Sequence, residues 1–284
     1  MRFGLDVATD GPWADPRLLV ELAREAESAG WDGFFVWDIF FPEEATDPVA
    51  DPWIALAAVG AATSRIRIGA MVTPFPRRQP WDVARSLVTL DHLTDGRALL
   101  GAGLGWRAEE LDRLGLAADM RSRVERLEEG LLIVDRLWSG EPFSHVGRQH
   151  RLADVQVLPR PIQRPRIPIW LAAGWPRTAP LRRAMQWDGV CLMAEHQFTG
   201  ERISPDDVRA VAALVGLERQ DAFDIAANVA TLEEADGGRS VAQAMADAGA
   251  TWIVELTPET VDEHLALIRR GPPQVASRNS AHGS

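Results

Sequence analysis

Short apolar runs alternate with longer amphipathic segments along the whole chain. The runs are nearly continuous in apolar residues and rich in β-branched or aromatic side chains, as in strands buried on both faces of a parallel sheet. They lie at residues 3–7, 33–37, 66–72, 98–103, 167–172, 189–193, 223–229 and 251–256. The segments between them repeat with a period of about 3.6 and predict helices. These lie at 16–29, 51–63, 80–93, 121–138, 180–187, 206–215, 240–248 and 259–270.

Eight strand-and-helix units of this kind favour an α/β fold, the closed (β/α)8 TIM barrel, over an open sheet. The length of 284 residues suits one such barrel, which needs roughly 250. Residues 1–270 are therefore expected to form a single domain. The polar segment 271–284 lacks periodicity and is expected to be a disordered tail. Residues 139–168 interrupt the rhythm: they are rich in proline and alternate at 143–146 and 150–152. They predict a hairpin excursion between the fourth and fifth strands.

Composition excludes several classes of chemistry. The chain has no lysine, so all 30 basic residues are arginines, and Schiff-base and P-loop mechanisms are ruled out. A net charge of −11 argues against nucleic-acid binding. The longest apolar runs are too short for a membrane span, and the N-terminus begins with a strand where a signal peptide would need a charged segment. Cys191 is the single cysteine, which suits the cytoplasm.

Active sites of such barrels lie at the carboxyl ends of the strands. The polar or glycine-rich positions there are Asp6, Asp38, 71–74, 103–106, 173–177, Glu195, His196, Asn228 and Glu255. The histidines have no metal-ligand spacing, so no metal is expected. Gly101-x-Gly103-x-Gly105 lacks the dinucleotide-binding spacing, and these glycines instead allow a flat ligand or a neighbouring strand to come close.

The turn at 174–178 offers a phosphate site. This turn joins a predicted strand end to a predicted helix start, where free N–H groups favour an anion. Its candidate residues are Gly174, Trp175, Arg177 and Thr178. A plain strand-to-helix turn with surface arginines is the alternative.

Several segments in order resemble one family, the luciferase-like monooxygenases. They read GWDGFFVWD at 30–38, TSRIRIGAMVTP at 63–74, TLDHLTDGR at 89–97, GAGLGW at 101–106, LWSGEP at 137–142, LPRP at 158–161, PIWLAAG at 168–174 and GATWIVE at 249–255. The resemblance covers about residues 1–270. It implies a barrel that binds coenzyme F420 or reduced FMN at the C-terminal rim, with the quoted segments favouring F420.

The resemblance also implies positions for the cofactor. Its ring would lie over a bulge at Ala70, Met71 and Val72, where relatives often carry a cis peptide that does not precede proline. Gly103, Gly105 and Trp106 would border the ring. The phosphate would lie at 174–178, as the turn itself suggests.

Acid–base and substrate residues are expected around this ring. Asp38, Glu109 and Glu255 are the candidates for acid–base catalysis, with Glu110 as an alternative to Glu109. The substrate pocket is expected at Trp37, Ile39, Phe40, Phe75, Glu195 and His196, which predicts a hydrophobic or aromatic small molecule. F420-dependent relatives commonly have histidine where this chain has Ile39, and some have glutamate where it has Trp106. At these two positions the chain lacks the side chains that a mechanism of those relatives would use.

Three functions stay open at this point. The chain is a deazaflavin-dependent reductase or dehydrogenase, a monooxygenase that receives reduced FMN from a partner reductase, or a flavin-binding protein without catalysis. The resemblance also implies a homodimer that joins apolar helix faces on the barrel exterior.

Overall fold

A closed barrel of parallel strands forms the centre of the molecule. The computed structural model describes residues 1–42, 44, 46–219, 221–231 and 236–275. Around the barrel the strands run in the order β1 (Arg2–Val7), β2 (Gly33–Val36), β3 (Arg67–Pro74), β4 (Ala98–Gly103), β7 (Ile169–Trp175), β8 (Gly189–Ala194), β9 (Asp224–Val229) and β10 (Trp252–Glu255). The TIM barrel predicted from the apolar runs is confirmed, and β7 extends further toward the C-terminal rim than its run suggests.

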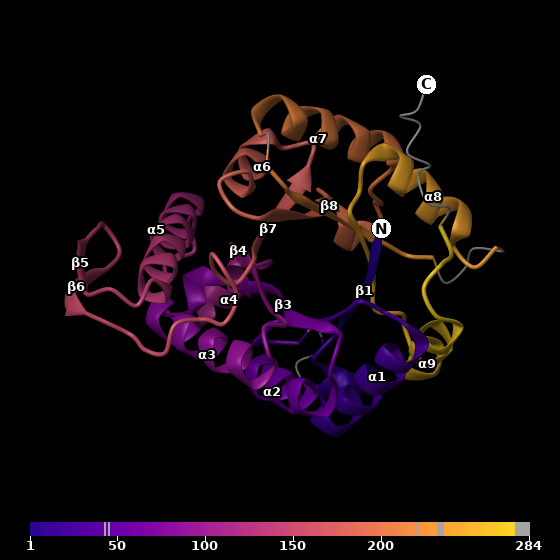
Figure 1. Cartoon of the computed structure of the whole chain (residues 1–284), viewed down its shortest axis with the longest axis horizontal. Coiled ribbons are helices and arrows are strands. Elements are labelled where there is room, and N and C mark those ends of the chain that lie inside the picture. Colours follow the sequence, from indigo (N-terminus) through magenta and orange to yellow (C-terminus); the bar gives the residue numbers. More distant parts are fainter. Residues whose placement is uncertain (43, 45, 220, 232–235, 276–284) are drawn as a thin grey trace.

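Helices surround this barrel as an outer ring (Figure 1). They are α1 (Pro16–Ala29), α2 (Pro52–Ala62), α3 (Pro80–Leu93), α5 (Met120–Trp138), α6 (Thr178–Ala184), α7 (Pro205–Glu218), α8 (Arg239–Ala248) and α9 (Val261–Arg270). The sequence pattern did not predict the short α4 (Ala108–Arg113), nor the 3-10 turns at Gly11–Ala14, Phe75–Arg77 and Gln197–Thr199. These short elements lie in loops, where hydrophobic periodicity carries no signal.

Local capping explains where the long helices begin and end. Asp51 accepts hydrogen bonds from two backbone N–H groups of α2, and Pro52 occupies the first helical position. Ser204 forms a capping box with Asp207 at the start of α7. Gly30 ends α1 with φ at 94°, in the left-handed region that favours glycine.

The predicted hairpin is confirmed as β5 (Phe143–Val146) and β6 (Arg151–Val155). In Figure 1 it projects beyond α5 at the left edge of the molecule. At the tip of the hairpin, the N–H groups of Arg148, Gln149 and His150 donate hydrogen bonds to the Glu129 carboxylate of α5. One carboxylate therefore satisfies the backbone of the turn and fixes the hairpin to the barrel.

Aromatic rings fill the middle of the barrel. Phe35, Trp170 and Trp252 contact one another with ring centroids 5.3 to 6.0 Å apart. Glycines face them, since a Cβ at Gly33 would lie 2.6 Å from the Phe35 ring and one at Gly189 would lie 2.5 Å from Trp170. The large rings need the space that the glycines leave, and together they form a plug that closes the barrel below the C-terminal rim.

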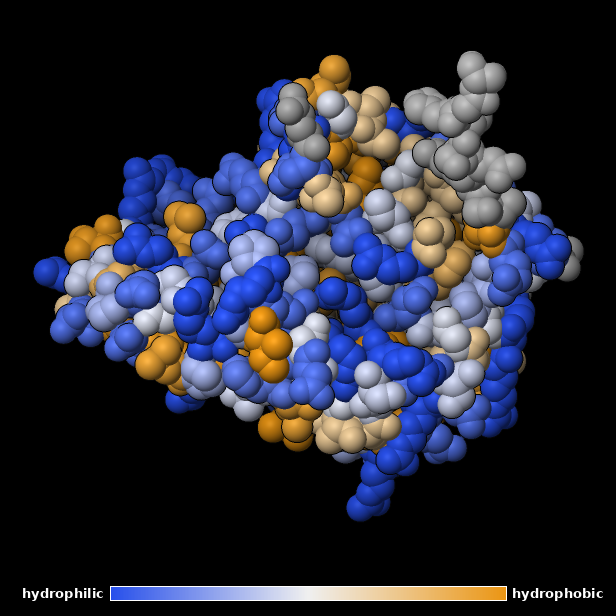
Figure 2. All heavy atoms as spheres, viewed as in Figure 1, coloured by the Kyte–Doolittle hydropathy of each residue, from blue (hydrophilic) through white to orange (hydrophobic). Residues whose placement is uncertain are grey.

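The chain after α9 continues against the barrel. Pro273 is buried and Val275 packs partly against the core. The remainder of the predicted tail, residues 276–284, lies outside the described residues. Among the residues described, no helix is both long enough and apolar enough to cross a membrane. The face shown in Figure 2 is mostly hydrophilic, with hydrophobic side chains in scattered groups.

Candidate active site

A cavity of about 1100 Å³ opens at the carboxyl ends of the barrel strands, above the aromatic plug. Twelve of the residues expected in the site line it. They are Trp37, Asp38, Ile39, Met71, Val72, Gly105, Trp106, Gly174, Arg177, Glu195, His196 and Glu255. The strand-end rule therefore gathers residues that are far apart in sequence around one space.

Other expected residues lie near the cavity without lining it. Phe75 is buried against Gly130 of α5, where a Cβ would lie 2.6 Å from its ring. Phe40 is half exposed and contacts Phe41. Ala70 and Gly103 lie in the strands behind the cavity wall, Trp175 packs partly against the core, Thr178 begins α6, and Glu109 is exposed on α4. On α4 it is Glu110 that reaches the cavity.

The β3 strand bulges beside the cavity, as the resemblance implies. Its pairing with β4 shifts register between Ala70 and Thr73, and the Met71–Val72 peptide is cis. A Cβ at Gly101 would lie 2.3 Å from the Ala70 carbonyl oxygen, and one at Gly103 would lie 2.6 Å from Val72 Cγ2. The glycine motif therefore lets a neighbouring strand come close, one of the two uses expected for it.

Asp38 lies buried beneath two arginines at the end of β2. Its Oδ1 accepts hydrogen bonds of 2.7 Å from Nη2 of Arg77 and of Arg78, and Arg78 Nε donates to Oδ2 at 3.1 Å. Arg77 Nε also pairs with Glu110 at 2.9 Å. These bonds occupy both carboxylate oxygens and fix the segment that carries Ile39 to the loop after β3.

The rim after β4, β7 and β8 is rich in arginine. These three strands are neighbours in the barrel, and the loops and helices that follow them bring five arginines to the cavity: Arg107, Arg123, Arg177, Arg183 and Arg202. Arg123 donates to the backbone oxygens of Leu104 and Gly105, and Arg177 pairs with Glu195. This side of the cavity can accept an anionic group.

Glu255 lies on the opposite side, at the end of β10. Its two oxygens accept hydrogen bonds from the Thr231 hydroxyl at 2.5 Å and the Thr231 N–H at 2.9 Å. Burial raises the pKa of Glu255, while these bonds act in the other direction. The carboxyl thereby holds the loop that follows β9.

A polar cluster at the cavity floor joins two of the strand-end candidates, to which no specific role was assigned from the sequence, with the single cysteine. It consists of Asp6, Cys191 and Asn228 from β1, β8 and β9, and all three line the cavity. Asn228 Nδ2 donates to Asp6 Oδ2 at 3.4 Å, and the Cys191 thiol donates to Asn228 Oδ1 at 3.3 Å. Asp6 Oδ1 is buried with no hydrogen-bond partner. Burial raises the pKa of Asp6 to about 8 and that of the Cys191 thiol further above its usual value.

The signal that could have found this cluster is present in the sequence. Asp6 and Asn228 are polar residues near the ends of otherwise apolar strands, and both stood among the strand-end positions. Their inward direction, and the depth at which they lie, become visible in the structure alone.

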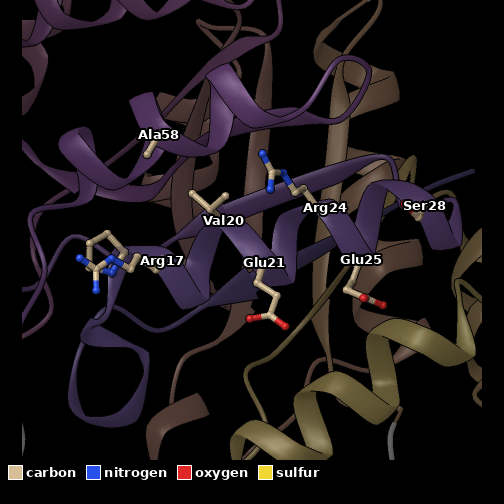
Figure 3. Close-up of a pocket in the computed structure, with 8 residues that line it drawn as sticks. Arg17, Val20, Glu21, Arg24, Glu25, Ser28 and Ala58 are labelled. Atoms are coloured by element: carbon tan, nitrogen blue, oxygen red, sulfur yellow. The ribbon is translucent and has the colours of Figure 1, made fainter.

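A second depression, of about 660 Å³, lies outside the barrel between α1 and α2. Figure 3 shows Arg17, Glu21, Arg24 and Glu25 along one face of α1 and Ala58 on α2. It is away from the strand ends and bounded by solvated charges, so we place the active site in the larger cavity. The described residues contain no group of three or more histidine, cysteine, aspartate or glutamate side chains that could hold a metal ion.

Comparison with known families identifies the class of protein. The sequence profile of the luciferase-like monooxygenase family matches residues 1–266. The chain belongs to this family, as the motifs in its sequence indicate.

Curated relatives that match the sequence include F420-dependent dehydrogenases. The chain is 34% identical over 169 residues to an F420-dependent glucose-6-phosphate dehydrogenase of Amycolatopsis mediterranei, a match to 58% of this chain and 50% of that protein. It is 35% identical over 165 residues to an F420-dependent hydroxymycolic acid dehydrogenase of Mycobacterium tuberculosis, covering 57% and 45% respectively. The chain thus matches about half the length of these relatives.

Solved structures share the fold over nearly the whole chain. An F420-dependent tetrahydromethanopterin reductase from Methanopyrus kandleri has a TM-score of 0.75 at 17% identity, with 94% of this chain and 96% of that one covered. An F420-dependent secondary alcohol dehydrogenase bound to an F420–acetone adduct has a TM-score of 0.78 at 15% identity, with 95% and 97% covered. A monooxygenase from Streptomyces bottropensis has a TM-score of 0.69 at 19% identity, with 95% and 97% covered.

Proposed function

We propose that this protein is an F420-dependent oxidoreductase that moves hydride between the cofactor and a carbonyl or alcohol carbon of a small hydrophobic molecule. The observation that carries the proposal is the cavity at the strand ends, bordered by the β3 bulge at Met71 and Val72. The names of the relatives quoted above, several of them F420-dependent dehydrogenases, support this choice of cofactor and reaction.

The residues present fit such a cofactor. Met71, Val72 and Gly105 border a space in which a flat ring can lie, and the close packing at Gly103 keeps Val72 at the cavity wall. The arginines on the rim after β4, β7 and β8 suit the anionic side chain of the cofactor. Within that rim, the turn with Gly174 and Arg177 is the proposed phosphate position. When bound, the deazaflavin would supply or accept the hydride.

The opposite wall suits an apolar substrate. Trp37 and Ile39, which follow β2, line it. On the arginine-rich rim after β4, Trp106 is exposed at the cavity, with the Arg107 guanidinium 4.6 Å from the centroid of its ring. Apolar walls exclude water from a hydride-transfer site. Ile39 can neither give nor take a proton, so the proton that a carbonyl reduction needs has another source. Asp38, whose oxygens are bound to Arg77 and Arg78, positions Ile39 and is not free to exchange one.

Titration of the purified protein with F420 and with FMN tests the proposal, with cofactor fluorescence as the signal. We expect F420 to bind more tightly than FMN and to be reduced or oxidised without oxygen uptake. Oxygen uptake with reduced FMN would instead support a monooxygenase, a function compatible with the structural similarity to the Streptomyces enzyme. Binding of neither cofactor would refute both functions.

Gly174→Asp tests the cofactor position. A Cβ there would lie 3.4 Å from the Glu195 Cα, so the variant adds a second carboxylate beside Glu195 and repels an anion. F420 affinity should fall at least about tenfold, or by about 1.4 kcal/mol. Gly216→Asp is the matched control, because nothing lies within 4 Å of a Cβ at Gly216. Equal F420 affinities of the two variants would show that the cofactor phosphate does not bind at this turn.

We also propose a homodimer that uses the outer face of α2. This helix is apolar on its exposed side, where Ile54 is 70% exposed and Ala58 and Ala61 are also exposed. An exposed apolar helix face is typical of a protein–protein interface. Sedimentation at micromolar concentration should give a dimer, and Ile54→Asp should give a monomer. A monomeric wild-type protein would contradict this.

A further inference from the structure

Reduction of a carbonyl needs a proton as well as a hydride, and most acids in this cavity are already engaged. Asp38 binds Arg77 and Arg78, and Glu110 binds Arg77. Glu195 pairs with Arg177 and Glu255 bonds Thr231. Asp6, in contrast, keeps one oxygen without a partner.

We propose that Asp6 is the catalytic acid of this site, whose carboxylic acid donates a proton to the carbonyl oxygen of the substrate and whose carboxylate accepts it back in the reverse direction. This inference rests on the proposed function, because it assumes that a carbonyl or alcohol carbon exchanges hydride in the same cavity.

The position of Asp6 supports this role. It lies near the end of β1, opposite Phe35 of β2 in the register of the two strands, and so directly at the aromatic plug. Its side chain is 5% exposed and lines the cavity floor. Asn228 holds Oδ2, which leaves Oδ1 as the oxygen that can meet a ligand. A buried carboxyl without a full set of partners costs stability, so a purely structural role does not account for it.

The surroundings of Asp6 keep it in the acid form. Cys191 on β8 and Asn228 on β9 face it, and the indole of Trp37, the residue directly after β2, also acts on it. Glu255 follows from β10, but both its oxygens bond Thr231. Burial raises the pKa of Asp6 to about 8, and the Trp37 indole and Asn228 amide act in the opposite direction. At neutral pH the group therefore has a proton to give, which an ordinary aspartate lacks.

The step balances in atoms and electrons. The carbonyl carbon receives a hydride, with its two electrons, from the reduced deazaflavin, and the carbonyl π pair moves to the oxygen. The O–H bond of Asp6 breaks as the alcohol O–H bond forms. The cofactor loses its second hydrogen to solvent as a proton, and solvent returns one proton to the Asp6 carboxylate. The ketone is reduced to an alcohol and the cofactor is oxidised.

Infrared spectroscopy of the protein without cofactor tests whether the proton is present. At pH 7 the wild type should show the C=O stretch of a protonated carboxylic acid, and Asp6→Asn should lose it. Asp224→Asn is the matched control, since Asp224 lies at the other end of the barrel in an ion pair with Arg2. It should keep the band. Should Asp6→Asn fail to fold, wild type labelled with carbon-13 aspartate should show an aspartic acid band that disappears with a midpoint near 8. A spectrum without such a band overturns the inference.

Single-turnover oxidation of reduced F420 by cyclohexanone tests whether the proton is used. Asp6→Asn should slow hydride transfer by about a hundredfold, within the range for positioned acids. It should leave F420 affinity unchanged within about twofold, or less than 0.5 kcal/mol. Hydride transfer at the wild-type rate would overturn the inference. So would a wild type that binds F420 and turns over neither cyclohexanone nor cyclohexanol.

The two experiments separate this inference from the function on which it rests. Failure of the infrared experiment refutes the acid role of Asp6 and leaves F420 binding untouched. A wild type that binds neither F420 nor FMN refutes the proposed function, and with it the role of Asp6 toward a substrate.

Discussion

Asp6 and Asp38 stand near the ends of adjacent strands, β1 and β2, and have nearly the same burial, at 5% and 6% exposed. Their environments are opposite. Asp38 accepts three hydrogen bonds from Arg77 and Arg78 in addition to the Arg77 bond to its backbone oxygen. Asp6 accepts one long hydrogen bond from the neutral Asn228 amide, and the neutral Trp37 indole is the other donor that acts on it.

These environments decide which of the two buried carboxyls is suited to proton transfer. A carboxylate held by two guanidinium groups contributes to structure, because its oxygens and its charge are already matched. Burial without a cationic partner raises the pKa of a carboxyl, so that such a group keeps its proton near neutral pH. The two aspartates are similarly buried but have different roles. Asp38 fixes the loop that carries Ile39, and Asp6 is the residue that we propose faces the substrate.

Removal of Asp38 should have the largest effect on this comparison. Asp38→Ala leaves Arg78 without its acid and Arg77 with Glu110 alone, and loss of one partner from a buried pair costs about 3 kcal/mol or more. Chemical denaturation should show this loss of unfolding free energy. Turnover of cyclohexanone should also fall at least about tenfold, because the wall at Ile39 shifts. A loss of unfolding free energy below about 1 kcal/mol would show that the ion pairs of Asp38 contribute no more than exposed surface pairs do.

The sequence predicted the barrel because its signal is periodic. Buried strand runs and helical spacing can be recognised from the local sequence, without knowing which elements they pack against. The caps at Asp51 and Ser204 confirm the predicted starts of two helices. The site was predictable as a rim of strand ends. The division between Asp6 and Asp38 was not, since the arginines that bind Asp38 lie 39 and 40 residues further along the chain.

Side-chain direction was the other missing part. Phe75 belongs by position to the rim, yet its ring turns outward onto Gly130 of α5. Gly130 leaves space for that ring, and the sequence around Phe75 contains no pattern that predicts this direction of its side chain. Asp6 shows the reverse case, in which a polar residue within a hydrophobic strand points inward to the cavity floor.

Ile39→His places a proton-carrying group just after the end of β2. The variant should add a titration near the ordinary histidine value of about 6.5 to the pH profile of hydride transfer. In the double variant with Asp6→Asn, part of the lost rate should return, on the order of tenfold. If wild type already shows that titration, another group carries the proton. No recovery in the double variant would mean that Ile39 lies out of reach of the substrate oxygen.

Asn228→Leu should have the smallest effect. The Asn228 amide lowers the pKa of Asp6, so its removal should shift the high-pH limb of hydride transfer upward, by less than about one pH unit. The Cys191 thiol also loses its acceptor, and the unfolding free energy should fall by about 1 kcal/mol. A downward shift of the limb would show that Asn228 does not act on Asp6 as a donor.

The pH dependence of stability reports whether Asp6 is protonated in the folded protein. The pKa of Asp6 rises from 3.8 to about 8 on folding, so between these values the folded state holds a proton that the unfolded state has lost. Wild-type stability must then fall as pH rises through this window, by at most about 1.4 kcal/mol per pH unit from this group. The unfolding free energy of Asp6→Asn minus that of wild type should therefore grow from about pH 4 to about pH 8 and stay constant above it. A difference that does not change with pH would show that Asp6 holds no proton in the folded protein within this window.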